Sequence, residues 1–318
     1  MLKYALYRLL LVIPTLLGIA VLVFFVLRVI PGDPVAIKLT SESAEISEEQ
    51  IQSERVRLGL ADPLHIQFTK YMAGIFVGDL GISLYTEHPV LEEIGGRIGL
   101  SIELALLSTF LSVLFGVPLG TLAALFRGSW FDYVIRVISI SGLAVPGFWL
   151  GMMIIMALLL TVGTLPPLGT TSIFEDPLTN LSQLIWPALS VAFRYSAVIA
   201  RMLRSSILEV LSEDYIRTAR AKGLKERMVI VKHGMRNALL PTVTVVGLEF
   251  AFLIGGLVVT EQVFNINGIG KMFVEAVVFN DFTMLQGLVL VVATSFVLVN
   301  LIVDLLYAAL DPRIRYQA

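Results

Sequence analysis

Between two long apolar stretches the chain reads Ser212-Glu-Asp-Tyr-Ile-Arg-Thr-Ala-Arg-Ala-Lys-Gly-Leu224. Acidic residues begin this segment and basic residues end it, which suits the helix dipole, and Gly223 can adopt the left-handed conformation that closes a helix. Nine helical residues extend only about 13 Å, too short to cross a membrane. We predict a short helix, then a second helix over 225–237 that leads into the apolar stretch from Leu239. Together they would form a rigid finger on which a partner could dock.

The composition around this finger is that of an integral membrane protein. Of 318 residues, 57% are hydrophobic and 15% charged, with a mean hydropathy of +0.86. Soluble domains average about 45–50% apolar and about 25% charged residues. The composition excludes a disordered chain, a collagen-like repeat and a disulfide scaffold, since there is no cysteine. The formal charge of −2 gives no reason to expect a nucleic-acid partner.

Six apolar stretches are long enough to span a bilayer, which needs about 20 residues. We therefore predict an all-α protein with six transmembrane helices. The first lacks a small-residue cleavage pattern after it, so we interpret it as an uncleaved anchor. The third contains Pro146-Gly147, which should bend or break it. The predicted spans are 9–30, 100–126, 131–162, 184–208, 239–263 and 284–310.

The basic residues predict the orientation, because short cytoplasmic loops are rich in Lys and Arg. Nine basic residues lie within 201–238, and others lie near both termini and around the turn after the second span. The loops 164–183 and 264–283 hold none and one (Lys271), respectively. We expect both termini and 201–238 to be cytoplasmic. The expected organisation is residues 1–30 as N-terminus and first span, 31–96 as an extracytoplasmic segment, 97–310 as the remaining five spans with a cytoplasmic loop 209–238, and 311–318 as a tail.

The extracytoplasmic segment should be a small helical insertion between the first two spans. Ser47-Glu-Glu-Gln50 is a capping box that starts a helix, and Gly59 should end it. Asp62-Pro63 has the form of an N-cap followed by proline at the first helical position, opening a helix that continues to about residue 76. The segment is either a solvated connector or a docking surface for a delivered solute.

Residues that could carry covalent or metal chemistry are sparse. The three histidines, His65, His88 and His233, are not paired at metal-binding spacing, and neither His-Glu-x-x-His nor Gly-x-Ser-x-Gly occurs. Residues 267–272 only faintly resemble a phosphate loop, lacking its first glycine and the Ser/Thr after lysine. We expect no catalytic residue, no metal and no cofactor in this chain.

Charged residues inside a bilayer are costly and are functional candidates by default. Arg194 and Glu249 lie at similar depths in two spans, so they form either a structural ion pair or part of a translocation path. Glu103 is a further path candidate, although it and Glu261 lie close enough to span ends to anchor at the membrane interface. Asp304, near the cytoplasmic end, is expected to fix helix packing.

Small residues at four-residue spacing predict close helix contacts within the chain. The pairs are Gly116-x-x-x-Gly120 and Gly147-x-x-x-Gly151. Pro118, Pro187 and Gly255-Gly256 interrupt other helices, which suits a transporter better than an inert anchor.

The finger also carries a specific resemblance. Residues 213–224, followed by Lys232-His-Gly-Met-Arg-Asn-Ala-Leu-Leu-Pro241, resemble the Glu-Ala-Ala loop of ABC importer permeases. The likeness is strongest to the first permease subunit of the dipeptide/oligopeptide family, which also includes nickel and glutathione systems. Arg217-Thr218-Ala219 takes the Glu-Ala-Ala position. Segments 28–35, 78–83 and 300–313 resemble the same family, whereas Asn267 departs from its usual proline.

The resemblance implies a type I ABC importer permease fold and half of a translocation path. It further implies a second related permease, with a heterodimer favoured, two cytoplasmic ATPase domains, an extracytoplasmic binding protein and surrounding membrane lipid in a bacterial or archaeal inner membrane. Di- or oligopeptides are the expected substrates, with nickel, glutathione and oligosaccharides as alternatives. The residues expected to couple to the ATPases are Asp214, Tyr215, Arg217, Thr218, Ala219, Arg220, Ala221, Lys222 and Gly223.

Two other classes of function stay open on the residues alone. An ion-coupled carrier could use Glu103, Glu249 and Asp304 as proton sites, but it leaves the finger unexplained. A membrane enzyme is disfavoured because no nucleophile–base or metal constellation occurs.

Overall fold

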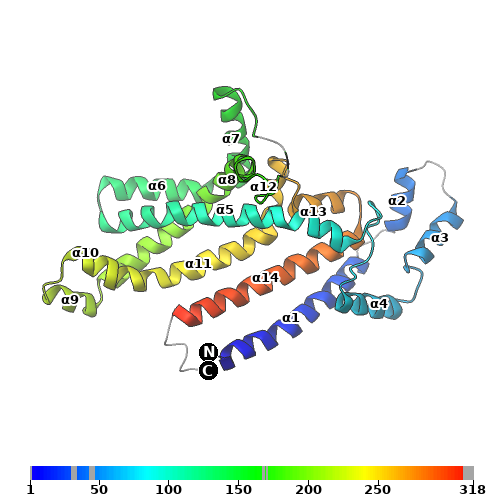
Figure 1. Cartoon of the computed structure of the whole chain (residues 1–318), viewed down its shortest axis with the longest axis horizontal. Coiled ribbons are helices and arrows are strands. Elements are labelled where there is room, and N and C mark those ends of the chain that lie inside the picture. Colours follow the sequence, from blue (N-terminus) through cyan, green and yellow to red (C-terminus); the bar gives the residue numbers. More distant parts are fainter. Residues whose placement is uncertain (1, 30–33, 43–46, 167–168, 170, 311–318) are drawn as a thin grey trace.

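A computed structural model describes residues 2–29, 34–42, 47–166, 169 and 171–310, and the regular structure within those ranges is helical. Five stretches of helix are long and apolar enough to cross a membrane. The fourth of them, 226–255, combines α10 (Glu226–Met228), the π-helix η1 (Val229–Gly234) and most of α11. The long helices run along the long axis of the molecule (Figure 1): α1 (Leu2–Val29), α5 (Val90–Leu125), α8 (Pro177–Leu211), α11 (Met235–Gly256) and α14 (Phe282–Leu310).

The third predicted span is broken. α6 (Trp130–Ala144) and α7 (Gly147–Thr161) meet at an angle of 104°, and α7 points away from the bundle in Figure 1. Pro146 disfavours helical geometry at the residue before it, and Val145 is extended with ψ 124°. The predicted bend or break at Pro146-Gly147 within the third span is confirmed. Within the described residues, length and composition allow up to six spans if this bent pair counts as one.

The α5–α8 contact forms the centre of the bundle, and glycines make it close. A Cβ on Gly116 would lie 2.8 Å from α8 atoms, and one on Gly120 only 2.6 Å from the Ala200 carbonyl oxygen. A Cβ on Gly151 of α7 would lie 2.9 Å from the ring of Phe264, whereas a Cβ on Gly147 would have no neighbour within 4 Å. The prediction of packing within the chain is therefore confirmed for the first glycine pair and for one member of the second.

The first and last helices pack side by side in opposite directions. Arg8 of α1 and Asp304 of α14 form an ion pair at 2.9 Å, which confirms the predicted packing role of Asp304. We call the end of the bundle where α1 begins and α14 finishes the terminal end. The α5–α6 turn and α9 (Asp214–Ala221) lie at this same end (Figure 1).

The opposite end carries three short helices, α2 (Pro34–Glu42), α3 (Glu48–Arg57) and α4 (Leu64–Val77). The capping box between Ser47 and Gln50 is present as predicted, and Gly59 turns the chain with φ +68°.

The predicted start of α4 is wrong by one residue. Pro63 itself is the N-cap, and no side chain caps the helix. Asp62 instead accepts a hydrogen bond from Lys70 Nζ, about two turns into the helix, at 2.7 Å. α4 packs on α1 through the stacked rings of Phe24 and Tyr71. α5 starts at Val90, ten residues before the predicted second span.

The fifth predicted stretch divides near Gly255-Gly256. α11 ends at Gly256, and α12 (Val258–Val263) and α13 (Ile269–Val278) follow before α14. These two short helices pack on one another and on α5, α7, α8 and α14. The predicted interruption at Gly255-Gly256 is confirmed, because a glycine pair is a poor helix interior. The continuous helix α11 therefore ends at Gly256, before the predicted end of the fifth span at residue 263.

Candidate functional site

The polar finger predicted from the sequence is an ordered unit at the terminal end of the bundle. α8 ends at Leu211, and α9 begins three residues later. One face of the finger is apolar: Ile216 and Val229 are fully buried and pack with Ala219 and the partly buried Leu224. Burial of an Ile or Val side chain stabilises by about 2 kcal/mol. The finger therefore has a small apolar core, which it shares with Val210 and Leu211 at the end of α8.

The turn after α9 has the geometry expected for its glycine. Gly223 has φ +75°, and its N–H donates to the Arg220 carbonyl oxygen at 2.9 Å. The N–H of Leu224 reaches back to the Ala219 carbonyl oxygen at 3.4 Å. An L-residue at this φ is strained. The predicted left-handed cap is confirmed.

Two polar contacts join α9 to the helical segment that follows it in the chain. Arg220 donates to both carboxylate oxygens of Glu226, at 2.7 and 3.2 Å. This hydrogen bonding raises the pKa of Arg220 above its usual value, so the side chain stays charged. The Tyr215 hydroxyl accepts a hydrogen bond from Asn237 Nδ2 at 2.8 Å. Both contacts brace α9 against the start of the next long helix.

The outer face of the finger is polar and solvent-exposed. Asp214 and Arg217 form an exposed ion pair at 3.1 Å, with side chains 90% and 76% accessible. Eight of the nine predicted coupling residues are exposed, and Ala219 is buried on the inner face. The exposed residues are Asp214, Tyr215, Arg217, Thr218, Arg220, Ala221, Lys222 and Gly223.

Sequence reasoning missed a wide helical turn in the second part of the finger. The predicted second helix, 225–237, divides into α10, the π-helix η1 and the first turn of α11. Val229, the first residue of η1, is fully buried against α9. π-Helical turns frequently mark functional sites. No local pattern in the sequence distinguishes this turn from an ordinary helix.

The three candidate path residues lie on three different long helices. Glu103 of α5 accepts a hydrogen bond from Asn180 Nδ2 of α8 at 2.6 Å, which supports an anchoring role. Glu249 of α11 is half-buried and Arg194 of α8 is exposed. These two are close enough to interact electrostatically, yet among the described residues no ion pair within 4.0 Å joins them. The structure thus brings Arg194 near Glu249 and leaves Glu103 in a separate polar contact.

A buried carboxylate that the sequence placed at the membrane interface proves to be an internal anchor. Glu261 of α12 is fully buried, so the interfacial assignment is wrong. It accepts hydrogen bonds from Ser101 Oγ of α5 at 2.7 Å and from the Lys271 N–H in the first turn of α13 at 2.9 Å. A helix N-terminus binds anions through its free N–H groups.

Residues 267–272, which faintly resemble a phosphate loop, need glycine at two positions because the Glu261 carboxylate and the α12 backbone lie so close. A Cβ on Gly268 would lie 2.4 Å from Ser101 Oγ and 2.5 Å from the Glu261 carboxyl carbon, and one on Gly270 would lie 2.7 Å from the α12 backbone. The two glycines therefore leave room for the Glu261 carboxylate at the start of α13.

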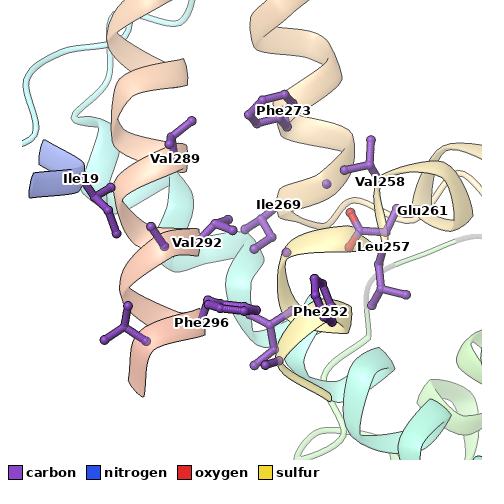
Figure 2. A pocket seen from close by; sticks show the side chains of 16 residues that line it. Ile19, Phe252, Leu257, Val258, Glu261, Ile269, Phe273, Val289, Val292 and Phe296 are labelled. Carbon is purple, nitrogen blue, oxygen red and sulfur yellow. The ribbon is translucent and has the colours of Figure 1, made fainter. Parts of the chain in front are cut away.

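An apolar cavity of about 410 Å³ opens beside Glu261. Figure 2 shows its wall of aromatic and aliphatic side chains, including Phe252, Phe273 and Phe296, with Glu261 at one edge. Ile19 of α1 completes the lining contributed by α11, α12, α13 and α14. Glu261, the charged residue of the lining, is already hydrogen-bonded within the chain, and the rest of the lining is apolar.

Comparison with known proteins agrees with this architecture. Residues 1–105 match the N-terminal component, and residues 116–316 the main component, of the family described as binding-protein-dependent transport system inner membrane component. The chain is 42% identical over 317 residues to the glutathione transport system permease protein GsiC of Salmonella choleraesuis (strain SC-B67) and 41% identical to that of Escherichia coli (strain K12). Both alignments cover all of each chain.

Solved structures of ABC transporters share the fold. The inward-facing MetNI methionine ABC transporter aligns with a TM-score of 0.55 and 19% identity, over 69% of this chain and 96% of the other. An amino acid ABC transporter crystallised with histidines aligns with a TM-score of 0.50 and 16% identity, over 76% and 98%. These identities establish the fold alone.

The helical bundle with its projecting finger is thus the type I permease fold of ABC importers. The chain belongs to the family of binding-protein-dependent transport system inner membrane components. It is a multi-pass membrane permease and not an ion-coupled carrier.

Proposed function

We propose that this chain forms half of the translocation path of an ATP-driven importer and receives mechanical work through α9. The observation that carries the proposal is α9, an ordered helix whose polar face is exposed and whose apolar face packs against the rest of the chain. Such a helix can dock in a groove of an ATPase and transmit its movement to the long helices α8 and α11. Tyr215, Arg217 and Thr218 would contact the ATPase, while Ala219 would pack the finger from within.

The same proposal fixes the orientation. α9 must face the ATPases, so the terminal end is cytoplasmic, both termini lie there, and α2–α4 lie outside. This agrees with the nine basic residues of 201–238 and the positive-inside rule. The three outer helices would then meet the substrate-binding protein.

A second permease subunit completes the path in this proposal. Arg194 is exposed on the chain by itself, yet it lies midway along a membrane-spanning helix. A guanidinium group facing hydrocarbon is costly, so this face of α8 must meet a polar path or a partner. A related but non-identical permease is the partner that we infer.

The substrate that we propose is a short peptide. Glutathione, the solute named for the relatives at 41–42% identity, is itself a tripeptide, and it is the second candidate. ATP hydrolysis would occur in the partner ATPases and not in this chain.

Single-cysteine cross-linking tests the coupling role directly, because the chain contains no cysteine. Thr218→Cys should cross-link to a co-purifying ATPase, whereas the buried Ala219→Cys should not. A membrane-impermeant maleimide should label Thr218→Cys only from the cytoplasmic side and Phe76→Cys of α4 only from the outside. Purification of the complex without any ATPase, or labelling of Thr218→Cys from outside, would overturn the proposal.

The substrate is tested by uptake into proteoliposomes that contain the purified complex and its binding protein. Radiolabelled di-, tri- and tetrapeptides, glutathione and Ni²⁺ should be compared with and without ATP. Competition by peptides is expected. Uptake of glutathione alone would select the second candidate, and uptake of Ni²⁺ alone would refute both.

A further inference from the structure

A basic pocket lies between α6 and α8 near the terminal end of the bundle. It has a volume of about 250 Å³, and its polar lining is Arg136 and Ser139 of α6 with Arg201, Arg204 and Ser205 of α8. The rest of the lining, such as Ile140, is largely aliphatic. It therefore combines guanidinium groups with an apolar wall.

The positive charge of the pocket is only partly neutralised within the chain. Asp132, which contacts two of the lining arginines, is 1% accessible. It accepts two hydrogen bonds from Arg204, both at 2.8 Å, and one from the Gly128 N–H at 3.0 Å. Arg136 approaches the same carboxylate at 3.5 Å. Three guanidinium groups against one carboxylate leave a net charge of +2.

Arg201 and Arg136 are the groups with capacity to bind an anion. Among the described residues, Arg201 has neither an ion pair nor a side-chain hydrogen bond. Arg136 is held in place over the Tyr133 ring, 4.4 Å from its centroid. Arg204 is committed to Asp132 in a bidentate pair, which is a strong arrangement. An arriving anion would thus meet Arg201, which has no counter-ion in the part of the chain that the structure describes, and Arg136, which is positioned over Tyr133 and shares its carboxylate with Arg204.

The surroundings of the pocket indicate the depth of lipid headgroups. α6 begins with an exposed aromatic cluster, Trp130, Phe131 and Tyr133, and such residues gather at membrane–water interfaces. Arg136 lies six residues beyond Trp130, about 9 Å along the helix, within reach of the interface for a long side chain.

The outer face of α6 next to the pocket is apolar and exposed. Its exposed residues are Val134, Val137, Ile138 and Ile140. A ligand that contacts both the arginines of the pocket and this apolar face has an anionic head and a hydrocarbon tail.

We propose that this pocket binds the phosphate group of an anionic phospholipid, with Arg136 and Arg201 as its ligands and an acyl chain along α6. Basic pockets between transmembrane helices on the cytoplasmic side suit such headgroups. Assignment to the cytoplasmic leaflet rests on the orientation proposed above. The bound lipid would join α6 to α8 and so stabilise the first half of the bent pair.

Lipid binding by the full chain, purified with its bound subunits, tests this without a transport assay. Native mass spectrometry should show phosphatidylglycerol retained in preference to phosphatidylcholine. Arg201→Gln should weaken that retention about five-fold, and Arg136→Gln with Arg201→Gln about thirty-fold, since each arginine near an anionic surface contributes a factor of about five. Arg127→Gln, an exposed arginine of the α5–α6 turn outside the pocket, is the matched control and should change little.

Four results would overturn the proposal. These are equal retention of the two lipids, an unchanged double variant, an equal loss in Arg127→Gln, and displacement of the lipid by millimolar inorganic phosphate, which would identify a free-anion site. Circular dichroism and gel filtration confirm that each variant is folded. The experiment measures the mass of retained lipid and does not depend on transport. A failure of peptide uptake or of ATPase cross-linking would therefore refute the proposed function without deciding whether the lipid binds.

Discussion

Replacement of Gly223 by proline should abolish transport while the membrane bundle remains intact. Gly223 has φ +75°, whereas proline fixes φ near −65° and removes the N–H that bonds to Arg220. The strain and the lost hydrogen bond together cost about 3–4 kcal/mol. The apolar core of the finger consists chiefly of Ile216 and Val229, worth about 2 kcal/mol each. The cost of the substitution is therefore nearly as large as the stabilisation of the finger by its apolar core. The packing of the membrane bundle is little affected.

Gly223→Ala distinguishes the effect of losing the backbone N–H from the effect of adding a side-chain atom. A Cβ at this position has nothing within 4 Å, so alanine adds only the strain of a left-handed residue, roughly 1–2 kcal/mol. We expect ATP-dependent uptake in proteoliposomes to fall more than tenfold for the proline variant and much less for alanine. Limited trypsin digestion should show faster cleavage at Arg217 in the proline variant only.

A matched control exists at the far end of α7. Gly163 has φ +73°, also has nothing within 4 Å of a Cβ, and donates its N–H to a helical carbonyl oxygen at 3.1 Å. Gly163→Pro therefore imposes the same local damage away from the finger. Normal uptake by Gly223→Pro, or an equal loss in Gly163→Pro, would refute the reasoning.

Three further substitutions test the packing of the bundle. Asp132→Asn should lower the free energy of unfolding by about 3 kcal/mol, because it leaves the half-buried Arg204 without its carboxylate; thermal unfolding in detergent measures this, and an unchanged midpoint would contradict it. Gly120→Val should destabilise by about 1–3 kcal/mol, since a Cβ would lie 2.6 Å from the Ala200 oxygen; an equally stable variant would show that α5 and α8 can separate freely. Glu261→Ala should loosen α13, because it leaves two donors unpaired; hydrogen exchange of 269–278 should quicken, and unchanged protection would remove Glu261 as an anchor.

Much of the fold is predictable because hydropathy, capping and helix breaking are local properties. The apolar stretches, the break at Pro146-Gly147 and the left-handed Gly223 follow from residues within a few positions of one another. The same holds for the capping box at Ser47. The errors at Asp62 and at the end of the fifth span are boundary errors, where a nearby ion pair or a glycine pair decides between neighbouring conformations.

The side-chain contacts that define the site are not predictable in this way. Asp132 and Arg204 are separated by 72 residues and Ser101 and Glu261 by 160, so no window along the sequence contains both partners. Glu261 therefore gave the signal of an interfacial carboxylate although it is fully buried.

The sequence by itself determined that this is a multi-span membrane permease with a projecting polar finger, because bilayer hydrophobicity and helix ends depend on short stretches of residues. Only the tertiary structure decided which face of the finger is exposed, that Ala219 points inward, and which of the charged residues in the spans are satisfied internally. Those outcomes depend on how α5, α8, α11 and α14 pack, and packing selects among partners that are distant in sequence.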